Sequence, residues 1–146
     1  MICYRVVRRK YADLSGDGAR LYGGRSNPVG VAAIYTAENI GLAVLEVLVH
    51  LDKSEVPNDY VVMAIDFPGR RAYRARAGES TRRLGSLAAS TFLDSRYFRP
   101  VLRVPSVIVP REHNYVLFPD AAGFEARIVW TELLEFDRRL FSFGTR

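Results

Sequence analysis

One carboxylate, Glu46, lies inside an apolar run that spans residues 40–51, and the only other polar side chain in this run is that of His50. On a helix, residues four apart share a face, so the spacing predicts that these two side chains are neighbours. Burying a carboxylate is costly unless it is paired or used in chemistry. We therefore expect Glu46 to be catalytic, with His50 in support. The alternatives are a buried salt bridge, for instance to Arg5 or Arg25, and a helix face turned to solvent.

Three further segments carry polar residues that could contact a ligand. A glycine pair precedes Arg25, and such a loop lets the backbone approach a phosphate that the arginine could bind. Tyr35 ends a predicted strand, where its ring would pack in the core or stack on a planar ligand. Ser106 and Asn114 could each donate a hydrogen bond to a ligand or complete a turn. For each of these four residues alone, the structural interpretation remains open.

Several common catalytic motifs are absent. The segment Gly16-Asp17-Gly18 begins like a dinucleotide fingerprint, but the third glycine is missing and no strong helix is expected after it. The sequence has no Walker lysine motif, no Gly-x-Ser-x-Gly elbow and no His-Glu-x-x-His. Because His50 and His113 are the only histidines, no metal site is predicted.

The length of 146 residues predicts a single domain over residues 1–146, and 49% hydrophobic with 25% charged residues is ordinary for a folded protein. Cys3 is the only cysteine, which excludes an internal disulfide framework. The N-terminus lacks the apolar core of a signal peptide, and no stretch reaches the ~20 apolar residues of a membrane span. We therefore expect a cytoplasmic protein. The net charge of +5 comes mainly from arginine, and a genome-wide bias toward arginine codons explains most of these residues. A basic surface would still attract nucleic acid, a nucleotide cofactor or an acidic partner.

Periodicity predicts strands and helices that alternate irregularly along the chain, so the expected fold is α+β, a single domain with a mainly antiparallel sheet and flanking helices. A long Gly-rich loop is expected over residues 13–30, and a solvated basic segment over residues 70–83. Strands are predicted over 3–7, 31–36, 60–67, 101–110, 115–118 and 126–136, and helices over 40–51 and 84–97.

The sequence resembles the RES domain family, named for an arginine, a glutamate and a serine, which here are Arg25, Glu46 and Ser106. The resemblance spans nearly the whole chain and is carried by several short segments in order. These segments are Tyr4-Arg5-Val6, Gly23-Gly24-Arg25-Ser26-Asn27, Ile34-Tyr35-Thr36, Leu45-Glu46-Val47-Leu48-Val49-His50-Leu51, Val104-Pro105-Ser106, Asn114-Tyr115 and Phe136-Asp137-Arg138-Arg139-Leu140-Phe141. Two departures are Ser26, where the family usually has Trp, and residues 118–122, where it usually has Asn-Pro-x-His-Pro.

The resemblance implies a toxin of a toxin–antitoxin pair with a fold similar to ADP-ribosyltransferases. Members consume NAD+ as a substrate by hydrolysis or phosphorolysis, without a bound prosthetic group, and others modify a protein. The implied partner is a helix-turn-helix antitoxin of the Xre type, which covers the active site and binds operator DNA, so that contact with DNA is indirect. A homodimer within the toxin–antitoxin complex is also compatible with the resemblance.

The resemblance also implies roles for individual residues. Glu46 would stabilise the cationic ribose as nicotinamide leaves, and Arg25 with Arg5 would hold the phosphates. Tyr35 would stack on the nicotinamide ring, and His50 would support Glu46. The remaining two side chains, Ser106 and Asn114, would position the substrate by hydrogen bonding.

Two other function classes are compatible with the residues alone. A small basic ribonuclease could use His50, Glu46 and His113 as acid–base groups, with residues 70–83 along the phosphate backbone. A non-catalytic interaction module could instead keep Glu46 as a buried pair and dock an acidic partner on the basic segment. RNA degradation without NAD+ would favour the first, and strong destabilisation by Glu46→Gln would favour the second.

Overall fold

The structure, a computed structural model, describes residues 1–54, 56–76, 79–83 and 99–141. Within these residues lie the α-helices α1 (Asp17–Tyr22) and α2 (Ile40–Leu48), and three short 3-10 turns, η1 (Arg9–Tyr11), η2 (Gly69–Arg71) and η3 (Arg138–Leu140). The strands are β1 (Ile2–Arg8), β2 (Ile34–Ala37), β3 (Tyr60–Asp66), β4 (Ala72–Arg74), β5 (Val101–Pro105), β6 (His113–Leu117) and β7 (Arg127–Leu133).

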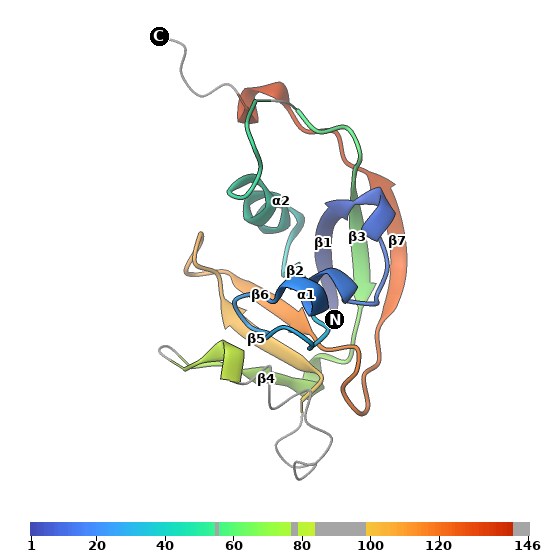
Figure 1. Cartoon of the computed structure of the whole chain (residues 1–146), viewed down its shortest axis with the longest axis vertical. Coiled ribbons are helices and arrows are strands. Elements are labelled where there is room, and N and C mark those ends of the chain that lie inside the picture. Colours follow the sequence, from blue (N-terminus) through green and yellow to red (C-terminus); the bar gives the residue numbers. More distant parts are fainter. Residues whose placement is uncertain (55, 77–78, 84–98, 142–146) are drawn as a thin grey trace.

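The strands form one seven-stranded sheet in the order β4-β5-β6-β2-β1-β3-β7 (Figure 1). Every neighbouring pair is antiparallel except β4 and β5, which are parallel. The predicted α+β class with a mainly antiparallel sheet is therefore confirmed.

The sheet divides into two halves at the contact between β1 and β2. These strands share a single register pair, Tyr4 with Ala37, whereas β1 and β3 pair along the whole length of β1. In Figure 1, β1, β3 and β7 run side by side on one side of the molecule, and β4, β5 and β6 run in a different direction on the other. Helix α2 packs mainly against β1 and also contacts β2, so it lies where the two halves meet.

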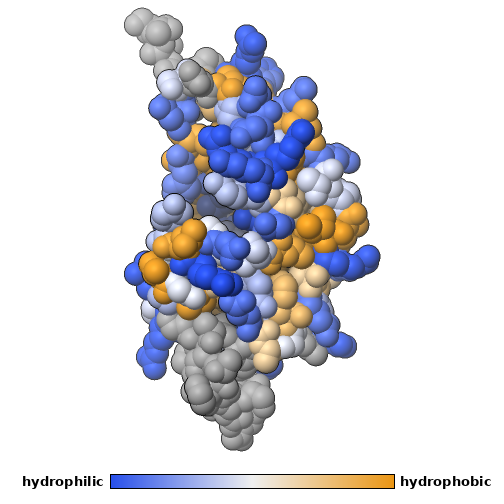
Figure 2. Space-filling view, turned by 45° about the vertical axis from the view of Figure 1, so that its right-hand side comes forward, coloured by the Kyte–Doolittle hydropathy of each residue, from blue (hydrophilic) through white to orange (hydrophobic). Residues whose placement is uncertain are grey.

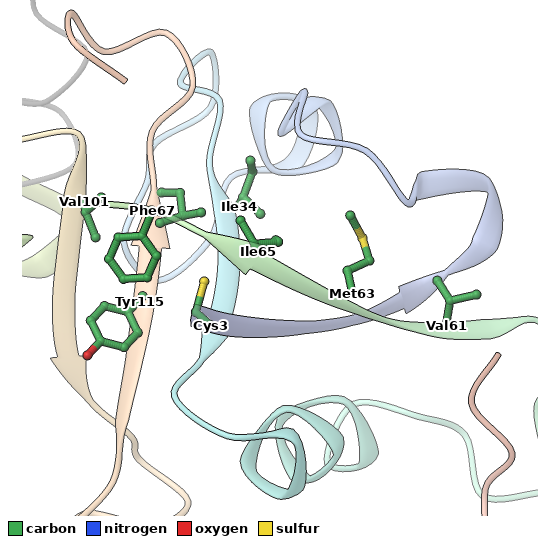
Figure 3. Close-up of a cluster of buried hydrophobic side chains, with 9 residues drawn as sticks. Cys3, Ile34, Val61, Met63, Ile65, Phe67, Val101 and Tyr115 are labelled. Atoms are coloured by element: carbon green, nitrogen blue, oxygen red, sulfur yellow. The ribbon is translucent and has the colours of Figure 1, made fainter. Parts of the chain in front are cut away.

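The core lies on both faces of β3, whose residues from Tyr60 to Ile65 are all buried. Alternate side chains of a strand point to opposite faces, so β3 contributes to two separate clusters. Val61, Met63 and Ile65 pack with Cys3 on the face turned away from α2 (Figure 3). The other face packs against α2, in the cluster Val6, Ala37, Leu42, Ala43, Leu48, Tyr60, Val62 and Phe136.

Helix α2 begins where the sequence predicts, because Asn39 caps it: the Asn39 Oδ1 accepts a hydrogen bond from the Leu42 N–H at 2.7 Å. It ends at Leu48, three residues before the predicted end. The last turn tightens, and the His50 N–H bonds to the carbonyl of Val47, three residues back. His50 therefore leaves the helical register that would have stacked it beside Glu46.

The Gly-rich loop expected over residues 13–30 contains a helix, α1, which the sequence interpretation missed. Gly16 precedes this helix with φ of 67°, and a Cβ there would lie 2.8 Å from the backbone nitrogen of Ala33. Glycine is required here on both counts. A short strand, β4, likewise replaces part of the predicted solvated segment 70–83. The helix predicted over residues 84–97 lies outside the described residues.

Strand β7 forms one edge of the sheet, and several of its apolar side chains are exposed. Ile128, Val129 and Leu133 are 40%, 45% and 51% exposed. Figure 2 turns this side of the molecule forward and shows separate hydrophobic groups among hydrophilic ones. No helix within the described part of the chain is long and apolar enough to cross a membrane.

Candidate active site

Glu46, on the second turn of α2, is half-buried and is held at one of its two carboxylate oxygens. Its Oε1 accepts a hydrogen bond from the Ser106 hydroxyl at 2.9 Å and another from the Asn114 Nδ2 at 2.5 Å. Within the described residues Glu46 forms no salt bridge, so the predicted alternative of an ion pair with Arg5 or Arg25 is not found there. The second oxygen, Oε2, has no hydrogen-bond partner among the same residues. It remains available to a ligand.

Ser106 directly follows β5 and is 3% exposed. Its Oγ accepts hydrogen bonds from the backbone N–H groups of Ile108 and Val109, each at 3.1 Å. A hydroxyl has one proton to donate and two lone pairs, so these contacts with Glu46 and the turn use its full capacity. Ser106 therefore acts as a support for the carboxylate and is poorly placed to attack a substrate as a nucleophile.

Asn114 lies on β6 and faces Ala37 of β2 on one side and Val104 of β5 on the other. An ionised carboxylate can only accept hydrogen bonds, so the contact with Glu46 fixes the amide with its Nδ2 toward the helix. The Asn114 Oδ1 is buried and has no hydrogen-bond partner in the part of the chain that the structure describes. The amide is thus oriented by the carboxylate alone.

The N-terminus of α2 is tied to the same segment that carries Ser106 and Asn114. The Asn39 Nδ2 donates to the Glu112 carboxylate at 2.9 Å, and the Glu38 carboxylate accepts from the His113 N–H at 2.9 Å. These bonds connect the helix to the β5–β6 turn at a second point. Glu46 and its two donors consequently belong to one connected unit.

Tyr35 on β2 locks the glycine loop in place. Its hydroxyl donates to the Asn27 Oδ1 at 2.6 Å and accepts from the Ser26 N–H at 2.9 Å. A Cβ on Gly24 would lie 2.5 Å from the Tyr35 hydroxyl, so only glycine allows this close contact. Burial raises the pKa of the Tyr35 phenol, while the Ser26 N–H and the positive charges of Arg82 and Arg25 act in the opposite direction.

Asn27 organises the loop that carries Arg25, a role that the sequence analysis did not assign. It is fully buried, and its Nδ2 donates to the carbonyls of Ala19, Pro28 and Val31 at 2.8, 3.2 and 2.9 Å. With its Oδ1 on Tyr35, the whole amide is satisfied. The only sequence signal was an asparagine within a Gly-rich loop, which is equally typical of a turn.

The predicted site residues Glu46, Ser106 and Asn114 thus meet directly, and Tyr35 shares their surroundings. Tyr35 and Ala37 lie on the same face of β2, and Ala37 faces Asn114, so Tyr35 and Asn114 are diagonal neighbours about 7–8 Å apart between Cα atoms. Arg25 directly precedes Ser26, whose N–H bonds to the Tyr35 hydroxyl, and the Arg25 side chain is exposed. A continuous path therefore joins the carboxylate to the arginine loop.

Arg5 and His50 are not brought to this group. Arg5 alternates with Tyr4 on β1 and shares the face of Cys3, which is turned away from α2. Its guanidinium donates to the carbonyls of Tyr11 and Asp13 at 3.2 and 2.8 Å, and burial lowers its pKa. His50 is exposed beyond the end of α2.

No group of three or more His, Cys, Asp or Glu side chains that could hold a metal ion occurs in the described ranges. The polar side chains described at the site are one carboxylate, its two neutral donors and the arginines beyond Tyr35.

A family model described as the RES domain matches residues 2–139 of the chain. The chain belongs to the RES domain toxin family. Two curated relatives support this assignment over most of their length. A RES protein of Photorhabdus laumondii named Toxin Res is 38% identical, and the match covers 96% of this chain and 97% of the relative. A Sphingobium protein named Prs ADP-ribosylating toxin is 37% identical over 80% of this chain and 81% of its own length.

The RES fold is also found in a solved structure, that of the MbcT–MbcA toxin–antitoxin complex of M. tuberculosis. The matched chain superposes with a TM-score of 0.60 over 96% of this chain and 86% of its own length. The identity is 18%, so the likeness concerns the fold. The resemblance to the RES family that the sequence suggested is confirmed.

Proposed function

We propose that this RES domain is the toxin of a toxin–antitoxin pair and cleaves the bond between nicotinamide and ribose in NAD+. The observation that carries the proposal is the Glu46 carboxylate, which is fixed through Oε1 by Ser106 and Asn114 and keeps Oε2 free of partners among the described residues. The names of the relatives, Toxin Res and Prs ADP-ribosylating toxin, support a toxin and chemistry on NAD+.

Glu46 would act on the ribose as the bond breaks. The nicotinamide nitrogen takes the bonding electron pair and leaves neutral, so positive charge develops on the ribose in an oxocarbenium-like transition state. A carboxylate already held in place stabilises that charge without having to reorganise. The free Oε2 can face the ribose or accept a hydrogen bond from one of its hydroxyls, while the two donors keep the side chain from turning away.

The remaining site residues would hold the rest of NAD+. The Tyr35 ring, fixed through its hydroxyl and partly exposed, offers a flat surface to the nicotinamide. Arg25 is positioned to bind phosphate. The Arg5 guanidinium is committed to two carbonyls on the other face of the sheet, so we assign it a structural role. His50 is given no catalytic role.

A second candidate is mono-ADP-ribosyl transfer to a protein. The 37% identity to the Prs ADP-ribosylating toxin favours this variant of the same chemistry. In either reaction the nicotinamide bond breaks in the same way, and only the group that forms the new bond to the ribose carbon differs: water, phosphate or a protein side chain. The described site contains no residue that selects among these acceptors.

We further propose that a helix-turn-helix antitoxin covers the site in the neutralised complex and that any contact with operator DNA runs through it. The structural neighbour comes from a toxin–antitoxin complex, which supports a protein partner. The apolar side chains of Leu45 and Val49, 40% and 56% exposed beside Glu46 on and just after α2, would suit a protein surface.

The experiment that tests the function is an assay of the purified protein with NAD+, with and without inorganic phosphate, followed by identification of the products by mass. We expect free nicotinamide in every active sample. ADP-ribose as the second product identifies hydrolysis, and its 1″-phosphate identifies phosphorolysis. Absence of nicotinamide under all conditions, including with added candidate protein acceptors, would contradict the proposal.

A further inference from the structure

Arg82, in the basic segment over residues 70–83, lies against the loop of Arg25. Its Nη2 donates to the carbonyl of Gly24 at 3.1 Å, and the hydroxyl of the preceding Thr81 lies 3.4 Å from the carbonyl of Arg25. The two arginines are more than fifty residues apart in the sequence. Arg82 is nevertheless bonded to the residue that directly precedes Arg25.

Both positive charges act on the same neighbour. The guanidinium groups of Arg82 and Arg25 each favour the ionised form of the Tyr35 phenol and so oppose the effect of burial on its pKa. This places both cations near the end of the Tyr35 ring that carries the hydroxyl. At the other end of Tyr35, its backbone on β2 lies next to β6, which carries Asn114, and Asn114 bonds to Glu46.

We propose that Arg82 is the second arginine of a pyrophosphate subsite, which it forms together with Arg25 on the far side of Tyr35 from Glu46. This inference rests on the proposed function, which makes the ligand a dinucleotide. Each phosphate of a dinucleotide carries a negative charge, so two guanidinium groups match its pyrophosphate better than one. The basic segment over residues 70–83 thereby gains a specific role at Arg82.

The geometry also explains why Arg82 suits this task better than Arg5. The Arg5 guanidinium is half-buried and bonded to two carbonyls of the η1 loop. Arg82 is exposed, and a guanidinium has five N–H donors, so a phosphate contact can be added to the bond with Gly24 and to its other interactions. Its anchoring on Gly24 orders the side chain before the ligand arrives, which lowers the entropic cost of binding.

The test is the affinity for ADP-ribose, measured by calorimetry on the full chain and compared with nicotinamide riboside, which has no phosphate. Arg82→Gln removes the charge, and Arg82→Lys keeps it. The matched control is Arg83→Gln, which removes the same charge one residue further on from an exposed side chain. A melting curve for each variant checks that the fold is retained.

We expect Arg82→Gln to weaken ADP-ribose binding about tenfold and Arg82→Lys to weaken it only about two- to threefold, with nicotinamide riboside unaffected. Arg83→Gln should bind ADP-ribose within twofold of the wild type. The inference is overturned if wild-type protein does not bind ADP-ribose, if Arg82→Gln binds it normally, if both Gln variants lose affinity equally, or if nicotinamide riboside binding falls in parallel. Because no turnover is measured, a protein that binds ADP-ribose through Arg82 but releases no nicotinamide would contradict the proposed function alone.

Discussion

The two ends of the candidate site are built in opposite ways. At the carboxylate end, the functional side chain itself is held, because the Glu46 Oε1 accepts from both Ser106 and Asn114. At the arginine end, the backbone is held by Tyr35 and Asn27, whereas the Arg25 side chain is exposed.

The difference matches the demands of the proposed reaction. Transition-state charge must be met by a group that needs no reorganisation, so a carboxylate beside the ribose gains from being fixed in advance. Phosphates far from the breaking bond need only to be captured, and a flexible cation on a rigid loop can do this. Changes at the carboxylate end should therefore alter the rate, and changes at the arginine end should alter affinity or, in the loop scaffold, stability.

The largest effect on stability is expected at the scaffold of the arginine end. Asn27→Ala would remove the amide that bonds three part-buried backbone carbonyls and the Tyr35 hydroxyl, and should lower the free energy of unfolding by about 3 kcal/mol. Chemical denaturation with urea measures this loss. The control is Asn58→Ala, at an exposed asparagine, which should change stability by less than about 0.5 kcal/mol. Equal stability of the two variants would contradict the role assigned to Asn27.

The next effect is expected at the carboxylate end. Ser106→Ala removes one donor to Glu46 but leaves Asn114 in place, so kcat for nicotinamide release should fall about 10- to 100-fold while KM changes little. Val107→Ala, at an exposed position in the same turn, is the control and should keep wild-type kcat. A Ser106→Ala effect confined to KM would mean that Ser106 contacts the substrate and does not act through Glu46.

A smaller effect is expected for the arginine side chain. Arg25→Ala should raise KM for NAD+ about tenfold, because a charge-assisted phosphate contact is lost, while the melting temperature stays within about 2 °C. Steady-state kinetics on Arg25→Ala and on the exposed control Arg9→Ala would measure it. If Arg25→Ala instead lowered kcat without changing KM, the contrast between the two ends would fail.

The smallest effect concerns the pH dependence of the loop. The pKa of Tyr35 is raised above its ordinary value of 10.0, mainly by burial, so the folded state favours the protonated phenol. Its contribution to stability is full below pH 10 and is lost as the pH rises through the raised value. Tyr35→Phe should be less stable than wild type by roughly 0.5–1 kcal/mol at pH 8, and this gap should close as the pH rises above the ordinary tyrosine pKa and through the raised one. A gap that widens with pH would contradict the assignment.

The sequence predicts the fold class and the strands well because their patterns are local. The strands β1, β3 and β7 appear close to their predicted bounds, since runs of β-branched and apolar residues favour strands. Helix α1 was missed because a six-residue helix between glycines carries little periodicity. The end of α2 at Leu48 was missed because no glycine or proline marks it.

The candidate site was predictable only in part. Glu46 stood out because a lone carboxylate in an apolar run needs a partner, and its partners are indeed two other predicted residues, Ser106 and Asn114. Alternation along β1 places Arg5 on the same face as Cys3, but which of the two faces α2 covers is decided by tertiary packing. The approach of Arg82 to the Gly24 carbonyl depends on a contact between distant segments, which spacing along the chain does not reveal.

The most direct measurement is nicotinamide release from NAD+ by Glu46→Gln. Glutamine keeps the size of the side chain and an oxygen that can accept from Ser106 and Asn114, so the melting temperature and ADP-ribose affinity should stay close to wild type. We expect the rate to fall about 10³-fold, because the charge that stabilises the cationic ribose is gone. The control Glu132→Gln, at an exposed position on β7, should keep the full rate. Wild-type turnover by Glu46→Gln would contradict the central claim.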